Sequence, residues 1–280
     1  MGSPFGSFLS QVLDHPLGRT YLQVFGWPFI STRVRANRIL SLLDAQKDEK
    51  ILDAGCGFGL YSLALANNGV NVVGVDIDEK QLSTASEWAG KLSLPNAQFE
   101  AVNICKLPYK DESFDKVLCV DVIEHILNDN LAISELARVL KVNGTLALTT
   151  PTPTMSQTHF FHRDTPEADG HVREGYTYKD ISGVLGNNGL SITEHHYYNR
   201  FFERFASEMN SFFLGRAGGL EELKEASVTG SMSNVRNLSP VLLTFPPLFV
   251  LSKLDSIIAP TVRKNCIAVK AKKQRPLGKR

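Results

Sequence analysis

The sequence predicts an α/β protein built on a doubly wound, mostly parallel sheet. Short apolar runs of strand length alternate with helical patterns from residue 50 onward, which is typical of a parallel sheet covered by helices on both faces. A glycine-rich run with Gly55, Gly57 and Gly59 follows the first strand-like segment, and Asp76 ends the second. Closely spaced glycines let backbone N–H groups approach a ligand.

The first fifty residues look helical. Residues 32–43 place Val34, Ile39, Leu42 and Leu43 close to helical spacing, so one face of this segment is expected to be buried. We therefore predict a helix immediately before the first strand.

Five strands are expected from their short apolar runs. They are residues 50–54, 71–75, 97–102, 114–120 and 144–150. Helical patterns separate them, among them residues 129–140. A further helix is expected at residues 178–185, with Thr177 as its N-cap.

The glycine run and the acid together indicate a nucleoside-binding crevice. Asp76 follows Gly55 by about 20 residues, the distance at which an acid ends the second strand and binds ribose hydroxyls. The glycines follow the pattern G-x-G-x-G, and Leu60 stands directly after the last of them. The dinucleotide fingerprint needs a third small residue later in the turn, so a pyrophosphate is the poorer fit.

Four segments, in order, resemble the class I S-adenosylmethionine-dependent methyltransferases, particularly the small-molecule branch that includes ubiquinone and menaquinone methyltransferases. They are ILDAGCGFG, VVGVDID, FEAVNICKLPYKDESFDKVLCVDVIEHI and ELARVLKVNGTLALTTP, and they extend over about residues 50–151. The resemblance implies a Rossmann-like, seven-stranded sheet with S-adenosyl-L-methionine as cofactor. Two further strands, near residues 190–197 and 266–271, would then finish the sheet as a C-terminal antiparallel hairpin.

The same resemblance divides the chain into four parts. They are an N-terminal helical cover (1–48), the cofactor-binding core (49–198 plus 264–272), a helical cap or substrate insertion before the last strand (199–263) and a basic tail (273–280). The insertion is rich in phenylalanine and ends in an apolar stretch broken by Pro246 and Pro247. It either packs onto the sheet, lines a pocket for an apolar acceptor or contacts a membrane surface.

The resemblance also implies the cofactor site. Its residues would be Asp53, Gly55, Cys56, Gly57, Gly59, Asp76, Ile77, Asn103, Ile104 and Asp121. Asp53 would brace the glycine turn, Asp76 would hold the ribose hydroxyls and Ile77 would cover the adenine. Asn103 departs from the family, which usually has an Asp there; an uncharged amide makes a weaker contact to the adenine amine, or Asn103 is simply a turn residue.

Candidates for acid–base chemistry are Glu124, His125, His162 and Tyr176. Methyl transfer from a sulfonium needs a base only if the acceptor must lose a proton. Glu124 and His125 follow the fourth strand at the carboxyl end of the sheet, where they either contact the reactants or cap the next segment. No metal is expected, because the spacing of His159, His162 and His171 is not that of a helical metal site.

Composition narrows the class of partner. Lys and Arg total 30 against 29 acidic residues, so the basic excess of a nucleic-acid enzyme is missing and no nucleic-acid partner is expected. The four cysteines show no C-x-x-C pair and are expected to be reduced thiols. With neither a leader nor a membrane-spanning run in view, a cytoplasmic protein is expected, with a possible peripheral membrane contact through the apolar segment near the C-terminus and the basic tail.

We therefore expect methyl transfer from S-adenosylmethionine to an oxygen or carbon of a small, apolar acceptor such as a quinone, isoprenoid or lipid. Methylation of a polar natural product or of a protein side chain stays open. So does a non-catalytic accessory protein that binds the cofactor. A nicotinamide dehydrogenase is disfavoured by the glycine spacing, and the sequence does not predict the oligomeric state.

Overall fold

The computed structural model describes residues 30–153, 172–198 and 265–274, with four single positions between 202 and 209. The chain separates into two compact units, Met1–Arg35 with Asn199–Arg263, and Ala36–Tyr198 with Lys264–Arg280. All the strands and the candidate site lie in the second unit, which is the one described below.

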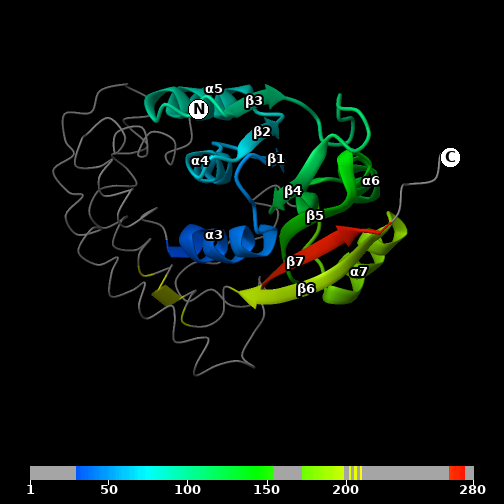
Figure 1. Cartoon of the computed structure of the whole chain (residues 1–280). Helices are drawn as coiled ribbons and strands as arrows, with labels where there is room; N and C mark the ends of the chain where they lie inside the picture. Colours follow the sequence, from blue (N-terminus) through cyan, green and yellow to red (C-terminus); the bar gives the residue numbers. More distant parts are fainter. Residues whose placement is uncertain are drawn as a thin grey trace. The chain divides into compact units, whose positions relative to one another are not determined.

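Seven strands form one sheet in the order β3-β2-β1-β4-β5-β7-β6 (Figure 1). The strands are β1 (Lys50–Ala54), β2 (Asn71–Asp76), β3 (Ala97–Ala101), β4 (Phe114–Val120), β5 (Leu140–Pro151), β6 (Leu190–Tyr198) and β7 (Cys266–Lys273). The first five pair in parallel, whereas β7 runs antiparallel to both β5 and β6. The predicted mostly parallel sheet with a C-terminal antiparallel hairpin is confirmed.

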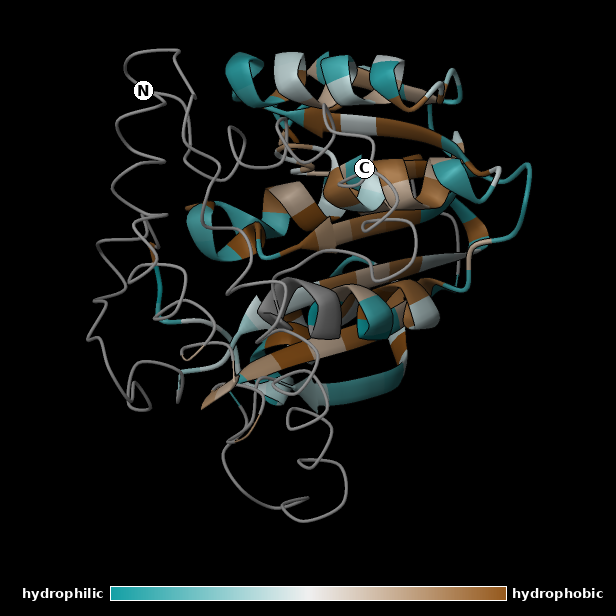
Figure 2. Cartoon of the chain, turned by 90° about the vertical axis from the view of Figure 1, so that its left-hand side faces the viewer, coloured by the Kyte–Doolittle hydropathy of each residue, from teal (hydrophilic) through white to brown (hydrophobic). Residues whose placement is uncertain are grey.

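Helices cover the sheet on both faces. They are α3 (Ile30–Leu43), α4 (Leu60–Asn67), α5 (Glu79–Lys91), the 3-10 turn η1 (Ile123–His125), α6 (Asp129–Val139) and α7 (Tyr178–Asn187). Helices α6 and α7 pack against the sheet in one apolar core. The C-terminal end of α3 and the helix α4 pack against the other side of the sheet in a second core. Figure 2 shows the strands mostly in the brown of apolar residues.

The predicted start of α7 follows from capping chemistry. The Thr177 hydroxyl accepts a hydrogen bond from the backbone of Asp180, whose carboxylate in turn accepts from the Thr177 backbone N–H at 3.0 Å. This reciprocal pair satisfies two N–H groups that would otherwise lack partners at the start of α7. The prediction that Thr177 is the N-cap is confirmed.

Two strand boundaries differ from the sequence prediction by more than one residue. β5 begins at Leu140, directly after α6 ends at Val139, rather than at residue 144. β7 runs on to Lys273, the first residue of the segment assigned to the basic tail, and this lysine is only 2% exposed. Its ammonium donates to the carbonyl oxygen of Leu140 at 2.7 Å, so a backbone acceptor at the end of α6 compensates for the burial. Burial also lowers the pKa of Lys273.

Several predictions fall on parts of the chain outside the described residues. They concern the part of the N-terminal cover that precedes residue 30, the apolar stretch of the 199–263 insertion and the basic tail after residue 274. They also concern His159, His162 and His171. These remain predictions.

Candidate functional site

The glycine-rich turn joins β1 to α4 at the carboxyl end of the parallel strands. Gly55, Gly57 and Gly59 all have left-handed backbones, with φ of 75°, 55° and 70°. The N–H groups of Gly55 and Cys56 donate to the carbonyl oxygen of Val75 at 2.8 and 3.0 Å. The turn is therefore fixed against the end of β2, which brings the two predicted halves of the crevice together.

Two of these glycines also leave no space for a side chain. A Cβ on Gly55 would lie 2.4 Å from a methyl group of Val122, and one on Gly59 would lie 2.6 Å from the ring of Phe99. Both distances are far below normal carbon–carbon contact. The close approach of these neighbours, together with the positive φ, explains why glycine stands at both positions.

Asp76 links the glycine turn to the start of α5. One carboxylate oxygen accepts from the Gly57 N–H at 2.9 Å and the other from the Asp78 N–H at 3.0 Å. Each carboxylate oxygen has a second lone pair, so the group can still accept hydrogen bonds from two ligand hydroxyls. The next residue, Ile77, is 77% exposed, so its apolar side chain is accessible to a ligand held by Asp76.

Asp53 lies beneath the turn rather than in the crevice. Its carboxylate is 1% exposed and accepts from the Ser62 hydroxyl at 2.6 Å. Burial raises the pKa of Asp53 to about 6, although the hydrogen bonds from Ser62 act in the opposite direction. Asp53 thus ties β1 to the first turn of α4. The neighbouring Cys56 is also buried, and burial raises the pKa of its thiol.

Asn103 and Ile104 follow β3 at the same end of the sheet. The Asn103 side-chain oxygen accepts from the Cys105 N–H at 2.9 Å, the geometry of an Asx turn, and the residue is exposed. Ile104 is 5% exposed and packs in the core that contains α6 and α7. In this structure the Asn103 side chain therefore makes the hydrogen bond of a turn residue.

The end of β4 carries the predicted acidic residue Asp121. Its backbone is left-handed, with φ 51°, and one carboxylate oxygen accepts from the Thr149 hydroxyl at 2.6 Å. The Asp121 N–H also donates to the Thr149 carbonyl at 3.0 Å. These two bonds hold β4 and β5 together where their carboxyl ends open toward the crevice.

Glu124 and His125 have different surroundings although they are adjacent. Glu124 is fully buried, accepts from the Thr150 hydroxyl at 3.2 Å and, through its backbone carbonyl, from the Val172 N–H at 3.0 Å. His125 is exposed. Of the two, only the imidazole of His125 is reachable by an acceptor from solvent.

Tyr176 belongs to a network with Arg173 and Asp129. Its hydroxyl donates to the Asp129 carboxylate at 2.6 Å and accepts from the Arg173 guanidinium at 2.5 Å. Arg173 also forms an ion pair with Asp129 and donates to the carbonyl oxygens of Ile126 and Leu127 at 2.7 and 3.1 Å. Burial, followed by the hydrogen bond to Asp129, raises the pKa of Tyr176. A phenol with a raised pKa is a poor base near neutral pH.

The sequence did not indicate several residues that shape the site. Val122 and Phe99 fix the glycine turn by contact, Ser62 holds Asp53, and Asp129 receives Arg173. Apart from Ser62, which lies nine residues from Asp53, they act across long sequence separations. Only Ser62, in the first turn of a helix that follows a buried acid, carried a local signal.

Within the described ranges, no group of three or more His, Cys, Asp or Glu side chains could hold a metal ion. All four cysteines are free thiols. No helix among the described residues is both long and apolar enough to cross a membrane.

Comparison with known proteins agrees with this geometry. A family profile described as "Methyltransferase domain" matches residues 52–148. The chain is 36% identical over 156 residues to a ubiquinone biosynthesis O-methyltransferase from Rhizobium etli, covering 52% of this chain and 61% of the relative. It is 35% identical over 114 residues to 27-O-demethylrifamycin SV methyltransferase from Amycolatopsis mediterranei, covering 40% and 42%. The chain thus spans less than two thirds of the length of either relative.

Among solved structures, the 4+2 cyclase SpnF superposes with a TM-score of 0.57 at 18% identity, over 86% of this chain and 80% of that one. At this identity the likeness concerns the fold. Since that neighbour is named as a cyclase, the reaction has to be argued from the site itself.

Proposed function

Because the chain carries a domain of the class I S-adenosylmethionine-dependent methyltransferase family, we propose that it transfers the methyl group of S-adenosylmethionine to a small acceptor. The observation that carries the proposal is the crevice formed by the glycine turn and Asp76. The glycine turn, a carboxylate with free lone pairs and an exposed Ile77 lie together at the carboxyl end of the strands. This is the end at which open α/β sheets bind nucleosides.

The residues fit this cofactor in chemical terms. The ribose carries two adjacent hydroxyl donors, which suit the two oxygens of Asp76, and the apolar Ile77 suits the adenine face. The glycine turn allows the amino-acid part to approach the backbone without a Cβ between them. The bound cofactor supplies an electrophilic methyl group on a sulfonium. The chain's part is to align the acceptor with that methyl group and to exclude water.

For acceptors that must lose a proton, we propose His125 as the base. Its ring is exposed at the carboxyl edge, and histidine can accept a proton near neutral pH. Glu124 is buried on Thr150, and the Tyr176 hydroxyl is engaged by Asp129 and Arg173. We assign both to holding the loops around the site. His162 stays a candidate, because it lies outside the described residues.

We propose an apolar or aromatic acceptor that is methylated at oxygen, or alternatively at carbon. Support comes from the two relatives, whose names describe O-methylation in ubiquinone biosynthesis and of a rifamycin. The phenylalanine-rich sequence of the 199–263 insertion is compatible with such an acceptor. A cytoplasmic protein with a peripheral membrane contact is part of the same proposal.

The first experiment measures S-adenosylmethionine binding by calorimetry for the wild type, Asp76→Ala and Glu87→Ala. Removing the Asp76 carboxylate is expected to weaken binding by at least ~1 kcal/mol, since a charged hydrogen-bond acceptor of the ribose is lost. Glu87 is a matched control, because it is an exposed acid on α5 whose partner is Lys91. Equal affinity in all three proteins would remove Asp76 from the site.

The second experiment supplies methyl-labelled S-adenosylmethionine and a total cell extract, followed by partition into organic, aqueous and protein fractions. Label in the organic phase supports the apolar acceptor. Label confined to the aqueous or protein fraction contradicts it in favour of a polar product or a protein side chain. Cofactor binding without any label transfer favours the accessory-protein alternative.

A further inference from the structure

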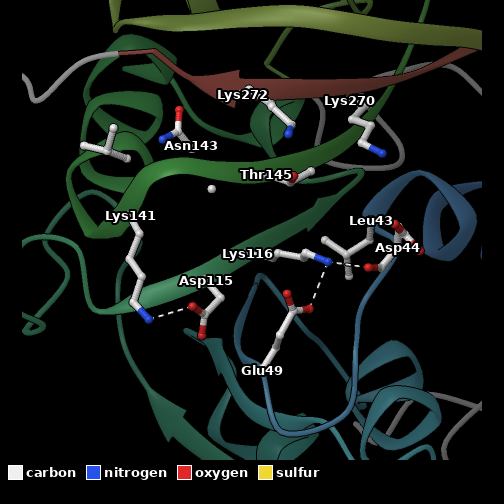
Figure 3. Close-up of a pocket in the computed structure, with 12 residues that line it drawn as sticks. Leu43, Asp44, Glu49, Asp115, Lys116, Lys141, Asn143, Thr145, Lys270 and Lys272 are labelled. Carbon is white, nitrogen blue, oxygen red and sulfur yellow. Dashed lines mark hydrogen bonds and ion pairs between the residues drawn. The ribbon is translucent and has the colours of Figure 1, made fainter.

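A second polar cavity lies at the opposite end of the sheet from the crevice. Its volume is about 310 Å³, and its lining includes Lys116, Lys141, Thr145, Lys270 and Lys272 (Figure 3). These residues come from the amino-terminal parts of β4 and β5 and from the carboxyl-terminal part of β7, which pairs with β5. The parallel strands run away from it toward Asp121, so the cavity is separate from the glycine turn.

Two of the four lysines are already neutralised by their neighbours. The Lys116 ammonium forms an ion pair with Glu49 at 2.9 Å and donates to the Asp44 carbonyl. The Lys141 ammonium pairs with Asp115 at 2.6 Å. Each of these two ion pairs is electrically neutral.

Lys270 and Lys272 are different. They stand two residues apart on β7, so both side chains project from the same face of the sheet, and Figure 3 shows them extending from β7 toward β5. Neither ammonium forms a hydrogen bond or ion pair with any residue that the structure describes. The lining holds four lysines and three carboxylates, those of Asp44, Glu49 and Asp115, so it carries a net charge of +1.

A hydroxyl donor lies directly beneath them. Thr145 pairs with Lys272 across β5 and β7, and with Lys116 across β4 and β5, so the three side chains form a row across the sheet. Thr145 is only 5% exposed, and no hydrogen bond joins its hydroxyl to the described part of the chain. A nearly buried hydroxyl with a free donor, next to two free cations, matches the needs of a tetrahedral oxyanion.

The three carboxylates of the lining do not form ion pairs with Lys270 or Lys272. Glu49 is held by Lys116 and by the Gln46 N–H, Asp115 by Lys141 and by the Lys50 N–H, and the Asp44 carboxylate by the Gln46 side chain. The three acids therefore make their contacts away from Lys270 and Lys272, and the lining keeps a net charge of +1, which favours an anion.

We propose that this cavity binds a phosphate group, either that of a soluble phosphate ester or that of an anionic lipid headgroup. The two unpaired ammonium groups attract the phosphate oxygens as charged donors, and the Thr145 hydroxyl and the Asn143 amide supply neutral donors around them. The site is independent of methyl transfer.

The test titrates the full chain with inorganic phosphate and follows backbone amide resonances by NMR. Three proteins are compared: the wild type, Lys270→Gln/Lys272→Gln, and the control Lys106→Gln/Lys110→Gln, which removes the same charge from exposed positions outside the cavity. We expect saturable shifts at residues 143–145 and 270–272, at least fivefold weaker binding in the cavity variant and less than a twofold change in the control. Thr145→Val is expected to weaken binding about threefold, with thermal melting confirming that each variant folds.

Vesicle flotation distinguishes the two sources of phosphate. Binding to phosphatidylglycerol vesicles but not to phosphatidylcholine, lost only in the cavity variant, supports the lipid source. Saturable phosphate binding without flotation supports a soluble ester. The proposal would be overturned if phosphate binding weakened equally in the cavity and control variants. It would also be overturned if the amide shifts did not saturate and the protein did not float with vesicles.

Discussion

Arg173 is expected to stabilise the fold more than any other charged side chain near the crevice. Its guanidinium makes an ion pair with Asp129 and hydrogen bonds to Tyr176, to Ile126 and to Leu127. The side chains of Arg173 and Asp129 are 26% and 18% exposed, so water partly screens the pair. Breaking a fully buried pair costs about 3–5 kcal/mol. With this screening, we expect Arg173→Met to lower the free energy of unfolding by about 2–4 kcal/mol.

Urea unfolding of a double-mutant cycle is the direct assay. Arg173→Met, Asp129→Asn and the double variant are compared with the wild type, and we expect a coupling free energy above about 1 kcal/mol. Arg173→Lys keeps the charge but lacks the planar fork, so it should recover no more than about half of the loss. A cost for Arg173→Met below about 0.5 kcal/mol, or additive single-variant costs, would refute the reasoning.

The remaining predictions concern the turn and its supports. Because the folded state raises the pKa of Asp53 from 3.8 to about 6, it retains a proton that the unfolded chain has released. The wild type should therefore lose about 2 kcal/mol of stability relative to Asp53→Asn as the pH rises from about 4 to 6.5; parallel urea-unfolding profiles would contradict this. Gly55→Ala should cost at least ~2 kcal/mol in the same assay, and adding Val122→Ala should recover the steric part but not the cost of the positive φ. Thr177→Ala should cost about 1 kcal/mol through loss of the α7 cap, seen in thermal melting, and an unchanged melting temperature would argue against the capping role.

The sequence predicted the strands of the sheet well because their signal is local. Apolar runs ending in glycine or acid mark β1, β2 and β4, and the capping pair at Thr177 marks the start of α7. The start of β5 was placed too late because Lys141 and Asn143 interrupt the apolar pattern, although parallel pairing with β4 extends to Leu140. Backbone pairing with a neighbouring strand overrides such a local interruption.

The candidate site was less predictable, because much of it depends on contacts between residues that are distant in the sequence. The glycines and Asp76 are recognisable from their spacing. The role of Tyr176, in contrast, depends on which residue its hydroxyl forms a hydrogen bond with. That partner, Asp129, lies 47 residues away, and no periodicity connects the two. Similarly, the free charges of Lys270 and Lys272 became visible only when the partners of Lys116 and Lys141 were known.

The position of β7 has a consequence for how the protein is made. This strand is inserted between β5 and β6, so its residues pair with residues that precede them by 68 positions or more. Until β7 emerges from the ribosome, β5 and β6 each present an unpaired strand edge, which invites pairing with other chains. A chain interrupted before residue 265 should therefore aggregate even though the cofactor crevice is already encoded. Folding of the sheet should be slow relative to that of its helices, because its closure waits for the most distant contact.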